Sequence, residues 1–325
     1  MMEKLTFDPN EVFRAAERIK GLIPVTPLDR SIFLSDDRDV FLKLECMQPV
    51  RAFKVRGALS RMTVLTDDER KRGVATISSG NHGASVAYAA KLLGIDRALV
   101  IVPSNAPLSK TDKIERYGGT VLRMGSDYDE AHRLGMKLIE ESGMTYIDAY
   151  YDDPLIYAGQ GTIALEILRQ NPDIDTIVVP IGGGGLITGI AAAAKAVKPG
   201  IRIIGVQTEA CPAMIASFRD NVFYNEYPVT GDTVCDALVG GVGLLSYSVL
   251  RDLVDDIIEV NEKDIRRRVR HMVINEKIVA EGGSCTAVAA VMHEKERVGG
   301  RNIALVISGG NIDGELLKEI LNESN

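Results

Sequence analysis

The chain has 325 residues, of which 46% are hydrophobic and 26% are charged, and its formal net charge at pH 7 is −7. The apolar content excludes a disordered chain, and the length predicts two lobes, because a globular domain has roughly 100–200 residues. The 38 Lys and Arg residues form no clustered basic stretch in this acidic chain, which argues against a nucleic-acid partner.

The N-terminal segment and the cysteines bear on the cellular compartment. The first twenty residues are charged throughout and contain no apolar core of the kind found in secretory signals. No apolar run reaches the ~18–20 residues that a membrane span needs, so we expect no membrane partner. Cys46, Cys211, Cys235 and Cys285 are scattered and lack zinc-site spacing, which predicts no metal site. We therefore expect a cytoplasmic protein.

Short apolar runs alternate with longer amphipathic ones in the first half of the chain. Near-continuous apolar strands that alternate with helices are typical of a parallel sheet covered on both faces. The predicted strands span residues 74–78, 97–103, 120–125 and 145–150, with a helix in each interval.

A second alternating series follows Pro154. It comprises a helix around 159–170, strands at 176–182, 202–208, 255–260 and 302–308, a basic helix at 262–277 and a small-residue segment at 282–291, while 39–45 adds an N-terminal strand. The predicted fold class is α/β, with two lobes that each contain an open, mainly parallel sheet covered by helices. We expect residues 1–64 and 152–325 to form a large domain, with a small domain of 65–151 inserted and no C-terminal regulatory domain.

The run of four glycines at 182–185 lies between the apolar strand TIVVPI and an Ala-rich helix. Bare glycine backbone exposes its amide groups to an anion, and the start of the helix adds partial positive charge. The pattern is neither GxGxxG nor a P-loop, and no lysine follows it to neutralise a triphosphate. A phosphomonoester site is therefore favoured over the alternative, a plain tight turn between a strand and a helix.

Three further motifs also follow predicted strands. Each has a purely structural interpretation: a surface lysine, a helix cap, or a polar turn. Each also has a chemical one, since a lysine beside an aromatic ring can form a Schiff base, and hydroxyl, amide and imidazole groups at a helix start can hold a carboxylate. Because ligands of open α/β sheets bind at the carboxyl ends of the strands, all of them can converge on one site. The motifs are AFKVRG at 52–57, SSGNHG at 78–83 and SGGN at 308–311.

Together these motifs, in this order and over residues 13–311, make the chain similar to the fold type II pyridoxal-phosphate enzymes. The resemblance is to the serine/threonine dehydratase and serine racemase group. It implies pyridoxal 5'-phosphate as cofactor and a deaminating β-elimination that converts L-threonine or L-serine to a 2-oxo acid and ammonia. It also implies a homodimer or homotetramer that acts on a small amino acid.

The same resemblance assigns roles to individual residues. Lys54 matches the Schiff-base lysine, which also removes the α-proton, and Ser79 matches a serine that acts as a second base in the racemase branch. The implied cofactor site comprises Phe53, Lys54, Asn81, Gly182, Gly183, Gly184, Gly185, Leu186, Glu281 and Ser308. The implied substrate-binding residues are Ser78, Ser79, Asn81, His82 and Gly83.

Three departures from the family pattern bear on the substrate and on the metal site. Ala52 replaces a serine before Phe-Lys, and Cys235-Asp236-Ala237 replaces Ala-Asp-Gly, which puts an extra methyl group near the cofactor. Gln207 stands where the racemase branch has a cation-binding glutamate, and hard cations prefer carboxylate ligands.

Alternatives to a threonine or serine dehydratase remain open. One is a serine racemase, and another is a dehydratase of a different 3-hydroxy amino acid, such as 3-hydroxyaspartate or a hydroxyectoine-pathway intermediate. A third is a cofactor-binding protein without turnover, against which the intact Lys54, Ser79 and Glu281 argue.

Overall fold

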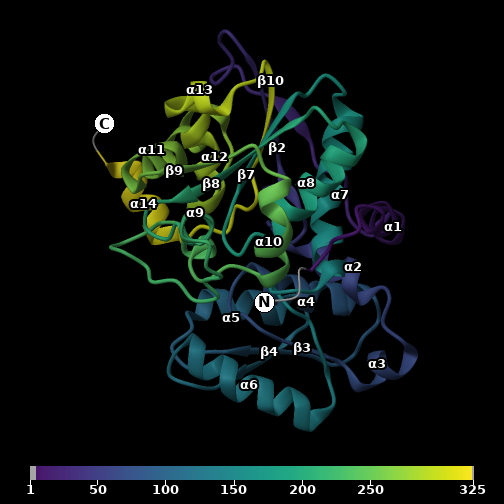
Figure 1. The fold of residues 1–325 in the computed structure, drawn as a ribbon. Helices are drawn as coiled ribbons and strands as arrows, with labels where there is room; N and C mark the ends of the chain where they lie inside the picture. The colour runs from purple at the N-terminus through teal and green to yellow at the C-terminus, as the bar shows by residue number, and fades with distance from the viewer. Residues whose placement is uncertain (1–4, 324–325) are drawn as a thin grey trace.

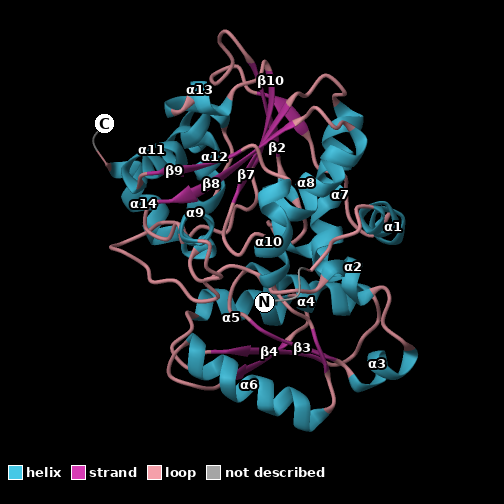
Figure 2. Ribbon diagram, viewed as in Figure 1, coloured by secondary structure: helices cyan, strands magenta, loops and turns pink. Residues whose placement is uncertain are grey.

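The computed structural model describes residues 5–323, which fold into two lobes, each built around one sheet (Figures 1 and 2). The strands are β1 (Leu28–Arg30), β2 (Asp39–Lys43), β3 (Val74–Ile77), β4 (Ala98–Val102), β5 (Thr120–Arg123), β6 (Thr145–Tyr146), β7 (Thr176–Pro180), β8 (Arg202–Thr208), β9 (Asp256–Val260) and β10 (Asn302–Val306). The helices are α1 (Asn10–Ile19), α2 (Lys54–Met62), α3 (Asp67–Arg72), α4 (Asn81–Leu92), α5 (Leu108–Arg116), α6 (Tyr128–Ser142), α7 (Pro154–Gln170), α8 (Gly185–Val197), α9 (Ala213–Asp220), α10 (Leu244–Val249), α11 (Glu262–His271), α12 (Gly282–His293), α13 (Lys295–Val298) and α14 (Gly314–Asn322).

The larger sheet has the strand order β1-β2-β10-β7-β8-β9. Its neighbouring strands are parallel except for β1, which pairs antiparallel with β2 at the edge. Buried side chains of α1, α7 and α8 pack on one face, and those of α11, α12 and α14 pack on the other. Both faces are therefore covered, which is why its inner strands are almost wholly apolar.

The smaller sheet has the order β5-β4-β3-β6, and all of its strands are parallel. Helices α4 and α5 cover the face turned toward the larger lobe, and α6 covers the other (Figure 1). Helix α2 packs against both α4 and α7 and so joins the two lobes. In the sequence, β3 to β6 lie between β2 and β7. The division into a small domain of residues 65–151 and a large domain of 1–64 and 152–325 stays a prediction.

The α/β class with two open, mainly parallel sheets is confirmed, but several predicted elements differ in extent. The predicted strand 145–150 pairs only at Thr145–Tyr146, and the rest of it leaves the sheet to contact the other lobe. The predicted basic helix 262–277 is α-helical to His271 and continues as a π-helical turn, Met272–Glu276. Segment 282–291 lies within α12. Strand β1 was missed because it has only three residues, two of them exposed.

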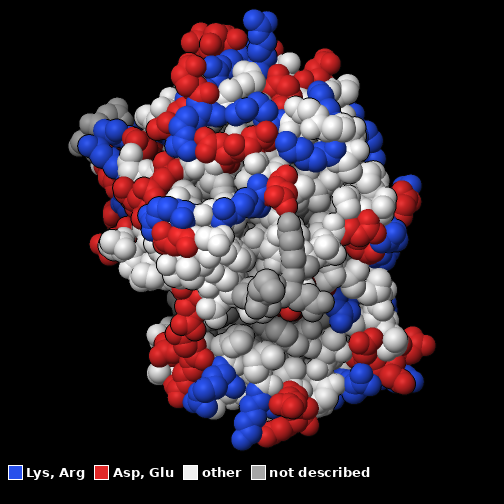
Figure 3. Space-filling view, in the orientation of Figure 1, with Lys and Arg blue, Asp and Glu red and all other residues white. Residues whose placement is uncertain are grey.

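The surface carries charges of both signs. On the face in Figure 3, acidic and basic side chains are interspersed over both lobes. All four cysteines are free and buried. Within residues 5–323, no helix combines the length and the apolar character that crossing a membrane requires.

A buried network of four charges joins the end of β2 to α2 and α7. Arg56 Nε and Nη2 donate to the two Glu45 carboxylate oxygens at 2.7 and 2.8 Å. Its Nη1 and Nη2 donate to the Glu166 oxygens at 2.7 and 2.9 Å. Lys43 Nζ donates to Glu166 Oε2 at 2.6 Å, so two cations meet two anions. Because every member has its partners, the network tolerates burial, and removing one member leaves an unpaired buried charge.

We expect Arg56→Met to lower the free energy of unfolding by about 3–5 kcal/mol, because it leaves the buried Glu45 without a cation and Glu166 with Lys43 as its remaining cation. Denaturant unfolding measures the change. Lys318→Ala, which breaks the exposed pair with Glu315, is the matched control and should cost less than about 1 kcal/mol. Equal effects of the two substitutions would contradict the role given to the network.

Candidate active site

Three of the four motifs follow neighbouring strands of the larger sheet. Strands β2, β10 and β7 are adjacent, so the segments after their carboxyl ends meet at one edge. Phe53 N donates to Ser308 O at 2.9 Å, and Ala52 forms a β-bridge with Gly309, which joins the AFKVRG and SGGN motifs directly. The SSGNHG motif follows β3 of the smaller sheet and reaches the same place through Asn81.

Lys54, the residue expected to form the Schiff base, begins α2. Its Nζ donates to Ala149 O at 3.0 Å and lies 5.4 Å from the centre of the Phe53 ring and 5.8 Å from that of Tyr150. Burial lowers the pKa of Lys54 to about 8, although the charges of Asp148 and Glu281 oppose the shift. About a tenth of the amine is therefore neutral, and nucleophilic, at pH 7, far more than for a lysine with its ordinary pKa.

The glycine run forms the start of α8 and presents bare amide groups. Gly184 is the N-cap of the helix, with φ +97°, a left-handed conformation that glycine adopts without strain. The amides of Gly182–Gly185 and Leu186 donate to no group within residues 5–323. Free amides at a helix N-terminus attract an anion through both their hydrogen bonds and the helix dipole.

Neighbouring side chains pack so closely on this run that a residue larger than glycine would not fit at position 183 or 184. A Cβ on Gly183 would lie 2.1 Å from Cδ2 of Tyr150, and one on Gly184 would lie 2.6 Å from Oγ of Ser246. The Ser246 hydroxyl in turn donates to the hydroxyl of Tyr157 at 2.9 Å. The run is therefore bare backbone bordered by Tyr150 and Ser246, and we call it the glycine cradle.

Ser308 follows β10 and is buried with an uncharged partner. Its Oγ lies 3.0 Å from Oγ of Ser284. Ser284 lies in the first turn of α12, directly after Gly282 and Gly283. Ser284 Oγ also donates to Gly309 O at 2.8 Å and accepts from Gly309 N at 2.7 Å. The two hydroxyls offer a ligand a neutral hydrogen-bonding group rather than a carboxylate.

Glu281, Asn81 and Asn311 form a hydrogen-bonded chain between the two lobes. Asn81 Nδ2 donates to both Glu281 oxygens, at 3.1 and 3.2 Å, and Asn311 Nδ2 donates to Asn81 Oδ1 at 2.6 Å. Lys113 of α5 donates to Asn311 Oδ1, and Asn311 N to Glu281 Oε2 at 3.1 Å. Because Asn81 Oδ1 is an acceptor here, its Nδ2 group is fixed on the side of Glu281. Burial raises the pKa of Glu281, although the bond from Asn81 opposes the shift.

The SSGNHG segment bends tightly into α4. A Cβ on Gly83 would lie 2.1 Å from Ser78 O, so only glycine fits there. Ser79 is half-buried, whereas His82 is buried, and its Nε2 lies 3.0 Å from Ile147 O. Burial, followed by the nearby Lys54 charge, lowers the pKa of His82 to about 4. His82 is thus neutral at physiological pH and can offer a carboxylate no positive charge.

The Cys235-Asp236-Ala237 segment lies beside the glycine run. A Cβ on Gly182 would lie 3.3 Å from Ala237 O. The segment in which this chain differs from the family's Ala-Asp-Gly pattern therefore borders the glycine run. Asp236 accepts from Lys110 of α5 at 3.0 Å, a second contact between the lobes. Gln207 is buried, and its Oε1 accepts from Met214 N and Ile215 N at 3.0 Å.

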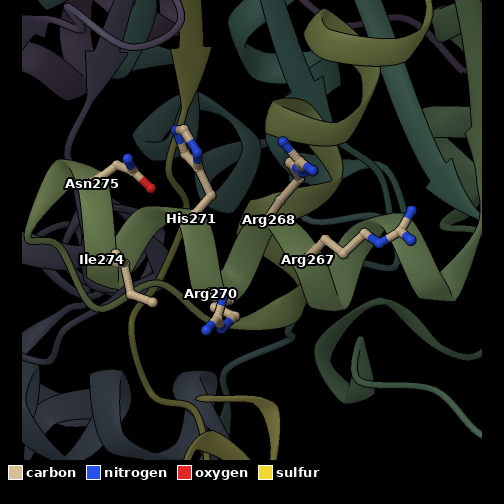
Figure 4. A pocket seen from close by; sticks show the side chains of 6 residues that line it. All are labelled: Arg267, Arg268, Arg270, His271, Ile274 and Asn275. Carbon is tan, nitrogen blue, oxygen red and sulfur yellow. The ribbon is translucent and has the colours of Figure 1, made fainter. Parts of the chain in front are cut away.

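A pocket of about 330 Å³ lies on α11 and the π-helical turn after it (Figure 4). Figure 4 shows Arg268 and His271 on one side of this helix and Arg270 on the other. None of the predicted site residues lines this pocket, so it is separate from the site of Lys54. Its lining residues are Arg267, Arg268, Arg270, His271, Ile274 and Asn275.

Comparison with known proteins gives the class to which this fold and site belong. The family described as "Pyridoxal-phosphate dependent enzyme" matches residues 19–309, and the chain belongs to this family. Pyridoxal phosphate is therefore its cofactor. The expected resemblance to fold type II pyridoxal-phosphate enzymes is confirmed.

Individual relatives cover nearly the whole chain. The L-threonine ammonia-lyase of Thermotoga maritima is 38% identical over 317 residues, which are 96% of this chain and 78% of the relative. The catabolic L-threonine dehydratase TdcB of Escherichia coli K12 is 38% identical over 315 residues, 96% of this chain and 95% of the relative. The structure of maize serine racemase superposes with a TM-score of 0.90 and 34% identity, covering 97% of both chains.

Several residues of the site were missed by the sequence analysis. Tyr150 was placed in a strand, and Ser246, Ser284 and Lys113 were not singled out. Ser284 had a detectable signal, because it follows Glu281 in a segment rich in small residues at the start of a helix. Lys113 had none, because it is 198 residues away from its partner Asn311 in the sequence.

We expect Gly183→Ala to weaken binding of pyridoxal phosphate by about 1–3 kcal/mol, roughly 5- to 150-fold in Kd, because the methyl group displaces the Tyr150 ring and enters the cradle. Titration of the cofactor-free protein, followed by visible absorption, gives the Kd. Gly200→Ala is the control, since a Cβ there meets nothing within 4 Å. Unchanged affinity in Gly183→Ala would contradict the cradle.

The lowered pKa of Lys54 predicts how cofactor capture depends on pH. Because only the neutral amine attacks an aldehyde, the rate at which cofactor-free protein captures pyridoxal phosphate should rise about tenfold per pH unit below pH 8 and level off above it. Stopped-flow absorption measures this rate. A rate that keeps rising to pH 10 would show that Lys54 keeps its ordinary pKa.

Proposed function

We propose that the predicted site residues hold the cofactor in the following way. Lys54 supplies the amine that bonds to the cofactor aldehyde, and the amides of 182–186 hold the phosphate. Ser308 hydrogen-bonds the ring nitrogen, and Asn81 the phenolic oxygen. Phe53 lies against the ring, and Glu281 positions Asn81. The residues fit the group because amine, anion cradle and neutral hydroxyl, the partners of its three functional ends, converge on one site.

We further propose that the enzyme is an ammonia-lyase that converts L-threonine, and L-serine, to a 2-oxo acid and ammonia. The observation that carries this proposal is the neutral pair Ser308 and Ser284 in the same site as the buried Lys54 amine. When bound, the cofactor withdraws electrons from the Cα–H bond of the amino acid. A neutral partner at its ring nitrogen moderates this withdrawal, which favours loss of the β-hydroxyl over transamination.

The chain's own residues bind the substrate and move the proton. The N-terminus of α4, with Ser78 and Gly83, faces the substrate carboxylate. Lys54, released as a free amine, takes the α-proton, and the β-hydroxyl leaves as water. Hydrolysis of the resulting enamine to the 2-oxo acid and ammonia consumes one water molecule, so elimination and hydrolysis together release no net water. The names of the Thermotoga and E. coli relatives support threonine as the substrate.

A second candidate function is racemisation of serine. Ser79 is half-buried, and its hydroxyl has no hydrogen-bond partner within residues 5–323, so it is free to act as the second base that the racemase branch uses. The similarity to maize serine racemase supports this candidate. A racemase needs two bases, whereas elimination needs only Lys54, so Ser79 distinguishes the two functions.

We also propose that the protein works in the cytoplasm as a homodimer or homotetramer. Ile32 and Phe33 are exposed, at 72% and 50%, in the segment after β1. The Phe33 ring contacts His271 of α11, and Ile274, one turn further on, is also exposed. This exposed apolar surface supports self-association. The four free, buried cysteines suit a reducing compartment.

Release of ammonia and 2-oxo acid from L-threonine and L-serine tests the function. We expect turnover by the holoenzyme, loss of at least about 10³-fold in Lys54→Ala, and loss of its visible absorption. Ser79→Ala should keep elimination within about tenfold while abolishing any racemisation, measured by chiral analysis of the remaining substrate. Racemisation without ammonia would favour the second candidate, and visible absorption that survives in Lys54→Ala would refute the lysine assignment.

A further inference from the structure

Two asparagine side chains form a continuous line of hydrogen bonds between the lobes. Asn311 Nδ2 donates to Asn81 Oδ1 at 2.6 Å, and Asn81 Nδ2 donates to the Glu281 oxygens at 3.1 and 3.2 Å. An asparagine amide accepts at its oxygen and donates at its nitrogen, and the two ends have nearly the same shape. The line therefore has a direction, which the groups at its ends have to set.

Glu281, at one end of the line, does not set the direction alone. Burial raises the pKa of Glu281, although the bond from Asn81 opposes this shift. A carboxyl group that holds a proton can donate as well as accept. Glu281 is therefore compatible with either end of the Asn81 amide, and the direction has to come from the other end of the line.

Lys113 of α5 stands at that other end, and it can only donate. Its Nζ donates to Asn311 Oδ1, and within residues 5–323 it forms neither a salt bridge nor a second hydrogen bond. An ammonium group has three N–H donors and no acceptor, so it requires the oxygen end of Asn311. Asn311 Nδ2 then faces Val50 O, at 3.0 Å, and Asn81 Oδ1.

This arrangement leaves the Asn81 amide one orientation. Because its oxygen accepts from Asn311, its nitrogen is turned toward Glu281. One of the two N–H groups can serve both Glu281 oxygens as a three-centre bond, and the second is then available to a ligand. A cation at the head of a line of hydrogen bonds also polarises the bonds that follow, which makes this N–H a stronger donor.

We propose that Lys113 is a positioning residue for the cofactor, which acts through Asn311 to hold an Asn81 N–H group on the phenolic oxygen. This inference rests on the contact between Asn81 and that oxygen in the proposed function. A donor at the phenolic oxygen stabilises its ionised form. Lys113 therefore influences the charge state of the cofactor from two side chains away.

The visible spectrum of the holoenzyme tests this inference without turnover. Pyridoxal phosphate bonded to a lysine absorbs at longer wavelength when its phenolic oxygen is ionised than when that oxygen keeps its proton. We expect Lys113→Met to lower the ratio of the ionised to the protonated form by about 3- to 10-fold, the effect of one lost hydrogen bond. Lys113→Arg keeps a cation that only donates, so its ratio should stay within about twofold of the original.

Lys110→Met is the matched control. Lys110 lies one turn earlier on α5 and also contacts the larger lobe, where it donates to Asp236 at 3.0 Å, but it has no bond to either asparagine. We expect this variant to keep the original ratio. If Lys110→Met and Lys113→Met lower the ratio equally, the two lysines only hold the lobes together, and the positioning role is overturned.

A double-mutant cycle shows whether the effect passes through Asn311. Asn311→Leu is similar in size, keeps the Lys113 charge and removes both ends of the amide. It should lower the ratio at least as much as Lys113→Met, and the double variant should lower it no further. An unchanged ratio in Asn311→Leu, or additive effects in the double variant, would overturn the inference, because the Lys113 charge would then act directly on the cofactor.

The outcomes distinguish this inference from the function on which it rests. An unchanged ratio in Lys113→Met overturns the positioning role, while release of ammonia from L-threonine still supports the ammonia-lyase. A ratio that responds to Lys113→Met in a protein that releases no ammonia from any 3-hydroxy amino acid refutes the proposed function and supports the positioning role.

Discussion

The position of Lys54 depends on a buried ionic network around Arg56, two residues further along α2. Arg56 binds Glu45 at the end of β2 and Glu166 of α7, and Lys43 completes the charge balance. Because Lys54 and Arg56 share the first turn of α2, fixing the guanidinium fixes where the lysine emerges. Full pairing offsets part of the cost of burying these charges. The bonds to Glu45 and Glu166 tie α2 both to the segment after β2 and to α7.

The second constraint is the segment 147–151, which connects the lobes and closes the site. Its carbonyl groups are used as acceptors by His82, Lys54 and Tyr157, which belong to three different helices. The lysine and the glycine cradle are thus tied to the same five residues, since Tyr150 also packs on Gly183. A shift of this segment would therefore move the acceptors of Lys54 and His82 together with the Tyr150 ring.

Much of this arrangement follows from sequence, and the remainder depends on contacts between distant residues. Apolar periodicity located nearly all strands, and the rule that ligands bind at carboxyl ends placed the motifs around Lys54, Gly183 and Ser308 together. The end of β6 was wrong because Ile147–Tyr150 is as apolar and aromatic as a strand, and only its tertiary contacts take it out of the sheet. Lys113 and Ser246 could not be found, because each acquires its role from a partner far away in the chain.

The chain of Lys113, Asn311, Asn81 and Glu281 links the geometry of the lobes to the electrostatics of the site. Asn81 belongs to the smaller lobe, whereas Asn311 and Glu281 belong to the larger, so Asn81 has its full set of bonds only when the lobes are together. Burial favours the neutral form of Glu281, and the bonds from Asn81 and Asn311 favour the charged form. The bonds from Asn81 thus tie the charge of Glu281 to the contact between the lobes, and that charge in turn opposes the lowering of the Lys54 pKa by burial.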